Sequence, residues 1–338
     1  MEKLINFPSL TGTVPRLRNT VKHWASTPIA KTVIALSCAS PALRHYFGRV
    51  GITPNRFGKR VVRVPFRERP GSLLIAGAAD VHLSFSLFWI GMDYYEPFTR
   101  TVIELLAARS EVFIDVGANI GFFSVVAGVL NPRLKVIAFE PNPKMFALLL
   151  EHKRANGLSN LTAEPLAVSN SDGTGQLFLS SSDMSASLQP DFQADFNPAC
   201  GSVFVERTTL DSYVRRHGVS GSVLLKVDVE GHDKAFLEGA WGTITELRPD
   251  IVLEVLGDFD PCALEQFKRS GYGFYRITHQ GLIESKAVTL TRIGDFVFYN
   301  YLFTTKSAGE LEEISRTMRE RARHIDLYRT SKFPDHPV

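Results

Sequence analysis

The sequence predicts an α/β fold: a Rossmann-like sheet with helices on both faces. Apolar runs typical of buried strands alternate with helical segments between residues 96 and 256, the pattern of a doubly wound sheet. A glycine-containing turn follows the first of these strands, and acidic residues follow the second and the fourth. With 338 residues, 44% of them hydrophobic and 22% charged, the chain is long and apolar enough to bury such a core.

The individual elements follow from hydrophobic periodicity and from residues typical of helix boundaries. Pro143 and Gly157 illustrate this, because proline suits the first turn of a helix and glycine suits the position after its end. Core strands are expected at residues 111–117, 134–140, 161–168, 222–231 and 250–256, with helices at 97–108, 122–130 and 143–156.

Further elements are expected on both sides of this core. Residues 59–66 and 83–91 read as strands of an N-terminal layer, and residues 272–278 and 295–303 as an antiparallel hairpin at the sheet edge. Near the C-terminus apolar residues recur at helical spacing in a charged segment, which predicts an amphipathic helix that packs on the domain. These apolar residues are Leu311, Ile314, Met318 and Ile325.

Basic residues are concentrated at the N-terminus. Residues 1–70 contain 13 Lys and Arg but two Asp and Glu, while the whole chain has a net charge of +3. Such a segment is typical of an organellar transit peptide, or of a surface that contacts anionic membrane lipid or an acidic partner. We do not expect a nucleic-acid partner, since this charge is its only support. The sequence does not indicate an oligomeric state.

The cysteine pattern and the apolar runs exclude several other classes. Cys38, Cys200 and Cys262 are widely spaced and form no zinc-binding motif, so a reducing, cytoplasmic location is the expectation. The apolar run at residues 28–39 is interrupted by Lys31 and is too short to span a bilayer.

The first candidate site is the turn after the first core strand. In open α/β sheets, ligands bind at the carboxyl ends of the strands. Gly117 and Gly121 allow sharp turns, and Asn119 tolerates a left-handed backbone, so backbone N–H groups can approach a ligand. Asp115 precedes this turn, where it would repel a pyrophosphate but could pair with an ammonium group.

Glu140 stands at the end of the second core strand, where an acidic residue typically accepts hydrogen bonds from both hydroxyls of a ribose. The turn reads G-A-N-I-G and does not match G-x-G-x-x-G, which disfavours a dinucleotide cofactor.

The end of the fourth core strand carries Asp228, Glu230 and His232, which we expect to be the catalytic residues. Alternation along a strand would send Asp228 and Glu230 to the same side. A carboxylate or a neutral imidazole there could accept a proton from a substrate hydroxyl. The irregular segment at residues 180–195 is long enough to be a lid or a mobile solvent loop.

No dedicated metal site is expected. Asp228, Glu230, Asp233 and Glu254 offer hard oxygen ligands that a divalent cation would accept. They form no recognisable metal-binding motif, so we assign no metal ligand.

Several motifs in one order carry a specific resemblance. VFIDVGANIGFFS, FEPNP, TLDSYV, LLKVDVEGHDKAFLEGA and IVLEV follow one another between residues 112 and 255. This part of the chain resembles the FkbM family of class I methyltransferases. The resemblance implies a seven-stranded Rossmann-like sheet that binds S-adenosylmethionine, and O-methylation as the activity. One departure is Asp233, where the family usually has glutamate, so its role stays open.

The resemblance also implies which residues bind the cofactor. The turn after the first strand would meet the methionine part, Glu140 the ribose, Asn142 the adenosine and Ser169 the edge of the adenine. An acidic residue before the first strand would close over the site. The cofactor-binding residues expected are Glu96, Asp115, Gly117, Asn119, Gly121, Glu140, Asn142 and Ser169.

The sequence therefore predicts an S-adenosylmethionine-dependent methyltransferase that methylates a hydroxyl of a small molecule, a sugar or a lipid. We expect a basic extension at residues 1–90, a methyltransferase domain at 91–305 and a C-terminal helix and tail at 306–338. Two alternatives stay open: an NAD(P)-dependent oxidoreductase, and a non-catalytic protein of this fold whose basic N-terminus binds a membrane or a partner.

Overall fold

The computed structural model describes residues 61–66, 71–77, 81, 83–84, 86–87, 91–180, 186–189, 199–257, 259–293 and 296–325. Most of the basic N-terminal segment lies outside these residues, so its expected roles in targeting or membrane contact stay predictions. Within the described part of the chain, no helix has the length and hydropathy needed to cross a membrane.

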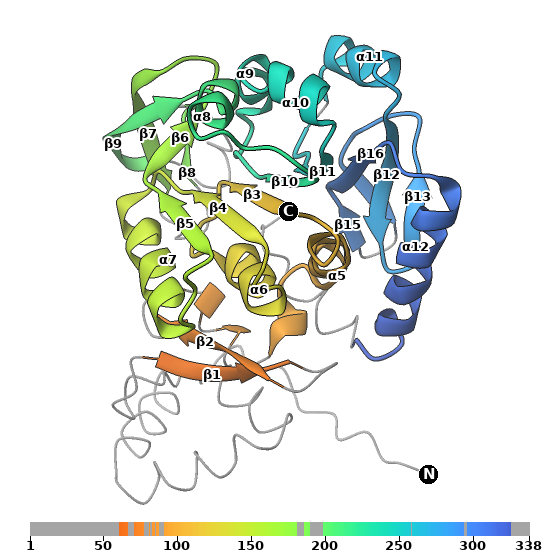
Figure 1. Ribbon diagram of the computed structural model, residues 1–338, viewed down its shortest axis with the longest axis horizontal. Helices are drawn as coiled ribbons and strands as arrows, with labels where there is room; N and C mark the ends of the chain where they lie inside the picture. Colours follow the sequence, from red (N-terminus) through yellow and green to blue (C-terminus); the bar gives the residue numbers. More distant parts are fainter. Residues whose placement is uncertain are drawn as a thin grey trace, which may run out of the picture.

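The central sheet has eight strands in the order β13-β12-β16-β11-β10-β3-β4-β5 (Figure 1). The five strands from β11 to β5 are parallel, whereas β16 runs antiparallel to both of its neighbours. The strands are β3 (Val112–Val116), β4 (Lys135–Phe139), β5 (Leu161–Glu164), β10 (Val223–Val227), β11 (Asp250–Glu254), β12 (Gly273–Thr278), β13 (Gly281–Glu284) and β16 (Asn300–Thr304).

The α/β prediction is confirmed, but the part of the central sheet that contains β16, β12 and β13 differs from expectation. The sheet has one strand more than the seven expected, because β13 folds back on β12 and forms the edge. The strand expected at 295–303 divides into β15 (Phe296–Phe298) and β16. β15 pairs with β14 (Thr291–Ile293), while β16 inserts between β11 and β12 instead of lying at the edge.

Helices cover both faces of the sheet (Figure 1). Two separate apolar clusters, one on each face, form the core. On one face lie α5 (Pro97–Ala107), α6 (Phe122–Leu130) and α7 (Pro143–Ala155), as expected from the sequence. The other face is covered by α8 (Leu210–Arg216), α9 (Asp233–Glu238), α10 (Trp241–Leu247) and α11 (Pro261–Arg269).

A smaller sheet follows β5, in the order β6-β9-β7-β8. The sequence predicts one strand at 161–168, but the chain leaves the central sheet at Pro165, since proline lacks the N–H that a ladder requires. The strands of this smaller sheet are β6 (Leu166–Val168), β7 (Gly173–Ser180), β8 (Ala186–Ser187) and β9 (Ala199–Thr208).

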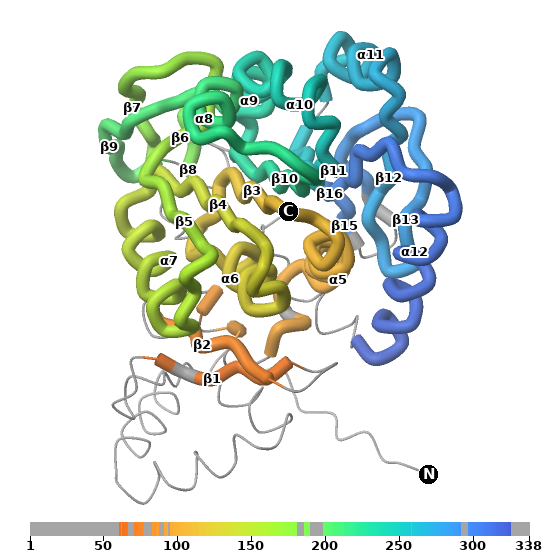
Figure 2. The backbone as a smooth tube through the Cα atoms, in the orientation of Figure 1, coloured from red at the N-terminus to blue at the C-terminus, as the bar shows by residue number. Residues whose placement is uncertain are grey.

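The N-terminal flank packs on the α6 and α7 side. The hairpin of β1 (Val61–Pro65) and β2 (Ser72–Ala76) lies beside α7 (Figure 2). The Leu74 backbone exchanges hydrogen bonds with the Asn156 side chain. The strand expected at 83–91 is wrong where the structure describes it, because residues 83–84 and 86–87 are helical. A short 3-10 helix, Met92–Tyr94, precedes α5.

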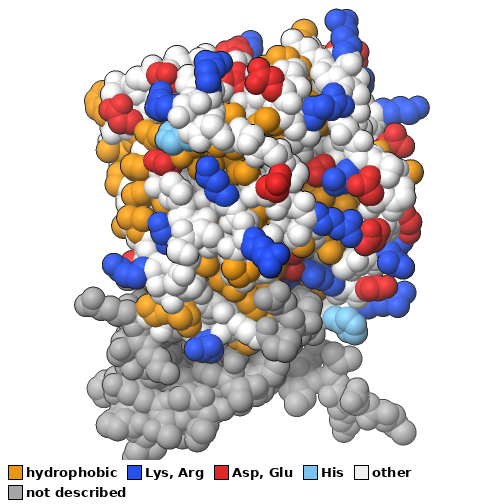
Figure 3. Space-filling view, in the orientation of Figure 1, with side chains coloured by type: hydrophobic (Ala, Val, Ile, Leu, Met, Phe, Trp, Pro, Cys, Tyr) orange, Lys and Arg blue, Asp and Glu red, His pale blue; other side chains and the backbone are white. Residues whose placement is uncertain are grey.

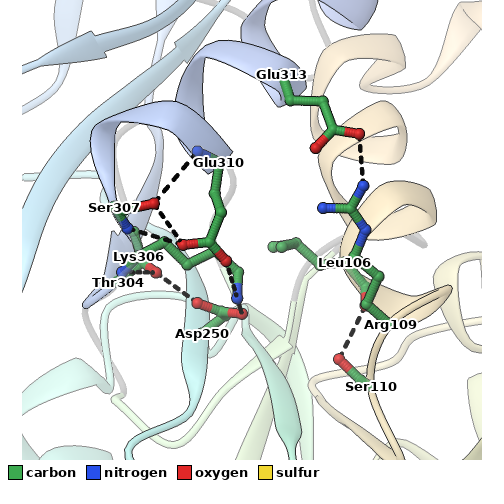
Figure 4. Close-up of polar contacts among 9 residues, drawn as sticks. All are labelled: Leu106, Arg109, Ser110, Asp250, Thr304, Lys306, Ser307, Glu310 and Glu313. Carbon is green, nitrogen blue, oxygen red and sulfur yellow. Dashed lines mark hydrogen bonds and ion pairs between the residues drawn. The ribbon is translucent and has the colours of Figure 1, made fainter.

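The amphipathic C-terminal helix is confirmed as α12 (Ala308–Ala322), which packs on α5 and β13. A capping box between Ser307 and Glu310 begins the helix, and Arg109 pairs with Glu313 at 2.6 Å (Figure 4). Its outer surface intermixes basic and acidic side chains (Figure 3). The four apolar residues expected to face the domain, Leu311, Ile314, Met318 and Ile325, are all buried.

Candidate active site

The candidate site lies where the order of the parallel strands reverses. From β3 the chain proceeds outward to β4 and β5 on one side, and β10 and β11 follow on the other. The turns after β3 and β10 therefore diverge and leave room for a ligand at their carboxyl ends. The cavity at this point includes among its lining residues Gly117, Asn119, Glu140, Asn142, Lys226, Asp228, Glu230, His232 and Glu254.

The turn after β3 is held in a left-handed conformation at Gly117, Asn119 and Gly121, with φ of 77°, 52° and 78°. Asn119, Glu96 and Glu230 are three of the four non-glycine residues with positive φ in the described part of the chain. Non-glycine residues adopt this conformation only when surrounding contacts impose it, and such positions often cluster at functional sites.

Gly117 is required at its position for a second reason. A Cβ atom there would lie 1.7 Å from the backbone oxygen of Asp228, so the turns after β3 and β10 touch through this glycine. Gly121 has a different neighbour, because a Cβ atom there would lie 2.2 Å from the Leu149 side chain. Gly121 therefore lets α6 approach α7, and it is not among the residues that line the cavity.

We expect Gly117→Ala to lower the free energy of unfolding by roughly 3 kcal/mol or more, since it combines a backbone clash with left-handed strain. Gly157→Ala is the matched control: Gly157 has φ 65°, but a Cβ atom there meets nothing within 4 Å. Strain alone should cost about 1 kcal/mol at Gly157. Urea denaturation measures both changes, and equal losses would show that the contact with Asp228 is unimportant.

Glu140 is fixed by the two turns around it. Its carboxylate accepts hydrogen bonds from the backbone N–H of Asn119 at 2.6 Å and of Asn142 at 2.7 Å. Each oxygen keeps a further lone pair for a ligand hydroxyl. Burial raises the pKa of Glu140 to about 7, although the two backbone hydrogen bonds act in the opposite direction.

One end of the cavity is charged. Lys226 is 2% exposed, and its Nζ lies 2.9 Å from the Asp228 carboxylate and 4.9 Å from the centre of the Phe123 ring. Burial alone would lower the pKa of Lys226, but Asp228, Asp115 and Glu96 together raise it above its ordinary value. The Lys226 ammonium group therefore stays charged inside the protein.

Asp115 lies beside Lys226 in the register of β3 and β10. It is 1% exposed, and one of its oxygens accepts a hydrogen bond from Ser124 at 2.6 Å. The other oxygen is buried without a hydrogen-bond partner among the described residues. Burial raises the pKa of Asp115, which Lys226 and Ser124 partly oppose.

Glu254 also lines the charged end, and Glu96 lies beside it without being among the residues that line the cavity. Oxygen atoms of Glu96, Asp228 and Glu254 all lie within 4.8 Å of one another, and the Asn300 amide donates to Glu96 at 2.9 Å. This group differs from the four hard oxygen ligands considered from the sequence, because it contains Glu96 and lacks Glu230 and Asp233.

His232 lies apart from these carboxylates. Its Nε2 is 2.9 Å from the hydroxyl of Ser169, and its Nδ1 has no hydrogen-bond partner among the described residues. Burial lowers the pKa of His232, and Arg207 lowers it further while Glu238 opposes the shift. Ser169 is fully buried and contacts His232, but it is not among the residues that line the cavity.

Glu230 lies beyond the strand expected to place it. Because β10 ends at Val227 and Glu230 has φ 49°, the alternation used to pair Asp228 with Glu230 does not extend this far. The segment around β8 holds the Glu230 turn, since Ser187 donates to the Glu230 carbonyl at 2.8 Å and Gln189 to that of Gly231 at 2.7 Å. The remainder of the loop expected at 180–195, residues 181–185 and 190–195, lies outside the described residues.

The other end of the cavity is apolar and suits a flat ring. It is formed by α7 and by the smaller sheet. Its side chains are those of Met145, Leu166, Val168, Leu177, Ala186 and Leu188.

Part of the chain matches a known protein family. Residues 115–273 match the family described as the Methyltransferase FkbM domain. They form an FkbM methyltransferase domain. The resemblance predicted from the motifs is thereby confirmed.

Two curated methyltransferases are similar in sequence to this chain. Hexuronic acid methyltransferase AglP of Haloferax volcanii is 30% identical over 166 residues, which cover 48% of this chain and 64% of that protein. The 31-O-demethyl-FK506 methyltransferase FkbM of Streptomyces tacrolimicus is 29% identical over 157 residues, covering 38% and 59%. The chain thus spans less than two thirds of either relative.

Among solved structures, the methyltransferase FkbM from Methylobacillus flagellatus is similar at 15% identity, covering 57% of this chain and 43% of that one, with a TM-score of 0.37. In this chain the FkbM domain includes the turns after β3, β4 and β10. Glu96 and Asn300 lie outside the matched residues, so the charged end of the cavity is built from both the FkbM domain and its flanks.

Lys226 and Glu254 are the charged lining residues, among those that the structure describes, that the site assignment from the sequence lacks. A signal for Lys226 exists, because it stands in the run VLLKV, whose other members are apolar and whose five residues are all buried. A lysine in a doubly buried strand needs a charged partner. Glu254 gives a similar signal, because it is the last residue of the neighbouring strand β11 and follows three buried apolar residues.

Proposed function

We propose that this protein transfers a methyl group from S-adenosylmethionine to a hydroxyl oxygen of a small molecule or glycan. The observation that carries the proposal is Glu140. Its two oxygens are oriented by the turns on either side of it, between an apolar end and a charged end of one cavity. Membership of the FkbM domain family supports the same activity.

The residues fit this cofactor along its whole length. The apolar end suits adenine, Glu140 suits the ribose hydroxyls, and the charged end suits the amino acid part. Lys226 offers a cation for the cofactor carboxylate, and Asp228 offers an acceptor for its ammonium group. Asp115 is buried beside Lys226 and is not among the residues that line the cavity. S-adenosylmethionine supplies a methyl group on a positively charged sulfur, which is already activated for transfer.

We assign the cofactor-binding roles as follows. Glu140 accepts hydrogen bonds from the ribose, Asn142 lies beside the adenosine, and Ser169 supports the adenine end through His232. Asp115, Gly117, Asn119 and Gly121 shape the turn that meets the methionine part, and Glu96 closes the charged end.

The chain's chemical task is to orient the acceptor and to remove its proton. The acceptor oxygen forms a bond to the methyl carbon as the carbon–sulfur bond breaks, and the hydroxyl proton leaves to a nearby base. Asp228, Glu230 and His232 line the cavity and are the candidates for this base. Asp228 also positions the substrates, because its carboxylate is held by Lys226.

The acceptor class rests on the names of the relatives. One acts on a hexuronic acid and the other on 31-O-demethyl-FK506, which supports an acceptor with a free hydroxyl. We propose a cytoplasmic location, since Cys200 and Cys262 are both exposed and unpaired, as a reducing compartment allows.

Calorimetric titration with S-adenosylmethionine, S-adenosylhomocysteine, NAD and NADP tests the proposal. We expect S-adenosylhomocysteine to bind in the micromolar range, because its adenosine, ribose and amino acid each have a matching part of the cavity. Neither dinucleotide should bind, since the carboxylates of Asp228 and Glu230 would repel a pyrophosphate. Binding of NAD in place of S-adenosylhomocysteine would refute methyl transfer and indicate an oxidoreductase.

A further inference from the structure

The charged end of the cavity holds more acidic groups than Lys226, the cation described there, can balance. Three carboxyl groups, those of Glu96, Asp228 and Glu254, have oxygens within 4.8 Å of one another. Lys226 is the ammonium group beside them, and Asp115 lies next to Lys226 in the adjacent strand. Carboxylates this close cannot all be ionised in a buried site, so at least one of them holds a proton.

The sheet register determines which carboxyl groups meet. β10 and β11 are parallel neighbours in the central sheet (Figure 1). In their register Val227 lies opposite Leu253. Asp228 and Glu254 follow these two residues directly, so they emerge side by side at the carboxyl ends of the strands. Glu96 reaches the same place from the start of α5.

The surroundings of each group differ. Asp228 has the Lys226 ammonium group at 2.9 Å, which stabilises its ionised form. Glu96 receives a hydrogen bond from the Asn300 amide. Glu254 is 7% exposed, and its acidic neighbours are Asp228, Glu230 and Glu96. It is the carboxyl group least able to carry a charge.

We propose that Glu254 is protonated at neutral pH and donates a hydrogen bond to Asp228, and that it thereby positions the Asp228 carboxylate at the acceptor. The chain of contacts runs from the Glu254 carboxyl group to the Asp228 carboxylate and on to the Lys226 ammonium group. Its role toward the acceptor rests on the proposed methyl transfer, whereas the protonation of Glu254 does not.

The electrostatic neighbours support this arrangement. Burial raises the pKa of Glu254 well above its ordinary value, and the charge of Asp228 together with a hydrogen bond to it raises it further. A buried carboxylic acid that stays neutral at pH 7 can serve as a hydrogen-bond donor. Glu254 is therefore a positioning residue that acts through Asp228.

Infrared spectroscopy of the ligand-free protein at pH 7 tests the protonation directly. We expect the wild type minus Glu254→Gln difference spectrum to contain the carbonyl band of one protonated carboxyl group. Glu164→Gln is the matched control, because Glu164 lies on β5 outside the cluster and accepts a hydrogen bond from Tyr213. That substitution should leave the band of Glu254 in place.

Measurements of turnover distinguish whether Glu254 acts as a hydrogen-bond donor or as an ionised group. The amide of Glu254→Gln can still donate to Asp228, so this variant should keep its turnover within about threefold of the wild type. Glu254→Ala removes the donor and should lower kcat by roughly tenfold to a hundredfold, with little change in the affinity for S-adenosylhomocysteine. Equal losses in the two variants would mean that Glu254 acts as a charge, which contradicts the proposal.

Two further measurements need no substitution at Glu254. Asp228→Asn removes the adjacent negative charge, so it should diminish the protonated-carboxyl band at pH 7. An unchanged band would contradict the proposed hydrogen bond between Glu254 and Asp228. Titration with Mg²⁺ tests the competing idea that the cluster holds a divalent cation. If Mg²⁺ abolished the band and raised Tm, Glu254 would be a ligand and not a donor. The spectra are recorded without cofactor. Absence of the band would therefore contradict the protonation of Glu254 without bearing on the proposed methyl transfer.

Discussion

Glu140→Ala should weaken the binding of S-adenosylhomocysteine by about a hundredfold or more. The substitution removes two charge-assisted hydrogen bonds to the buried ribose hydroxyls, each worth roughly 1.5–3 kcal/mol. It also releases the backbone N–H groups of Asn119 and Asn142, which Glu140 orients at 2.6 and 2.7 Å. Isothermal calorimetry at pH 8 measures the loss.

The exposed Glu151 on α7 provides the control, since Glu151→Ala makes the same chemical change outside the cavity and should leave the affinity unchanged. A loss of less than about threefold in Glu140→Ala would mean that the ribose lies elsewhere.

The affinity for S-adenosylhomocysteine should depend on pH through the carboxyl group of Glu140. Its pKa of about 7 means that Glu140 is mostly protonated below pH 7 and mostly ionised above it. A protonated oxygen cannot accept a hydrogen bond from both ribose hydroxyls, so affinity should fall as the pH drops below 7, by up to roughly tenfold per unit. In Glu140→Gln this dependence should disappear.

Asp228→Asn should lower turnover by about 10² to 10⁴, once an acceptor has been identified from a panel of sugars and hydroxylated small molecules. The amide keeps the shape of the side chain but can neither accept the hydroxyl proton nor pair with Lys226, whose Nζ lies 2.9 Å away. Release of S-adenosylhomocysteine under single-turnover conditions measures the chemical step apart from product release.

Comparison with three other variants locates the base. Asp233→Asn, a change of the same kind at the start of α9, should keep turnover near that of the wild type. Glu230→Gln and His232→Ala separate the remaining candidates, because His232 bonds to Ser169 whereas Glu230 is an electrostatic neighbour of Asp228. If Asp228→Asn, Glu230→Gln and His232→Ala all kept near-normal turnover, the proton acceptor would be a residue other than these three.

Much of the fold was determined by local sequence. The apolar runs of β3, β4, β10 and β11, the Asn142 and Pro143 start of α7 and the apolar stripe of α12 all fold as their periodicity predicts. These signals are local because strand alternation, helix capping and amphipathic spacing depend on residues only a few positions apart. The turn motifs likewise identified Gly117, Asn119, Glu140 and Asp228 as neighbours of one cavity.

Strand pairing depended on contacts between residues far apart in the chain. Pro165 ends β5 and sends β6 into the smaller sheet, and β16 enters the central sheet between β11 and β12. Both outcomes depend on which strand edges are available, which periodicity does not encode.

The composition of the charged end was decided only by the tertiary structure. Lys226, Glu254 and Glu96 come from β10, β11 and the start of α5, and the parallel register of β10 and β11 brings the first two together. No sequence spacing links them. The residues at the carboxyl ends of the strands could be read from the sequence, but which of them share a proton or a cation depends on the order of the strands in the sheet.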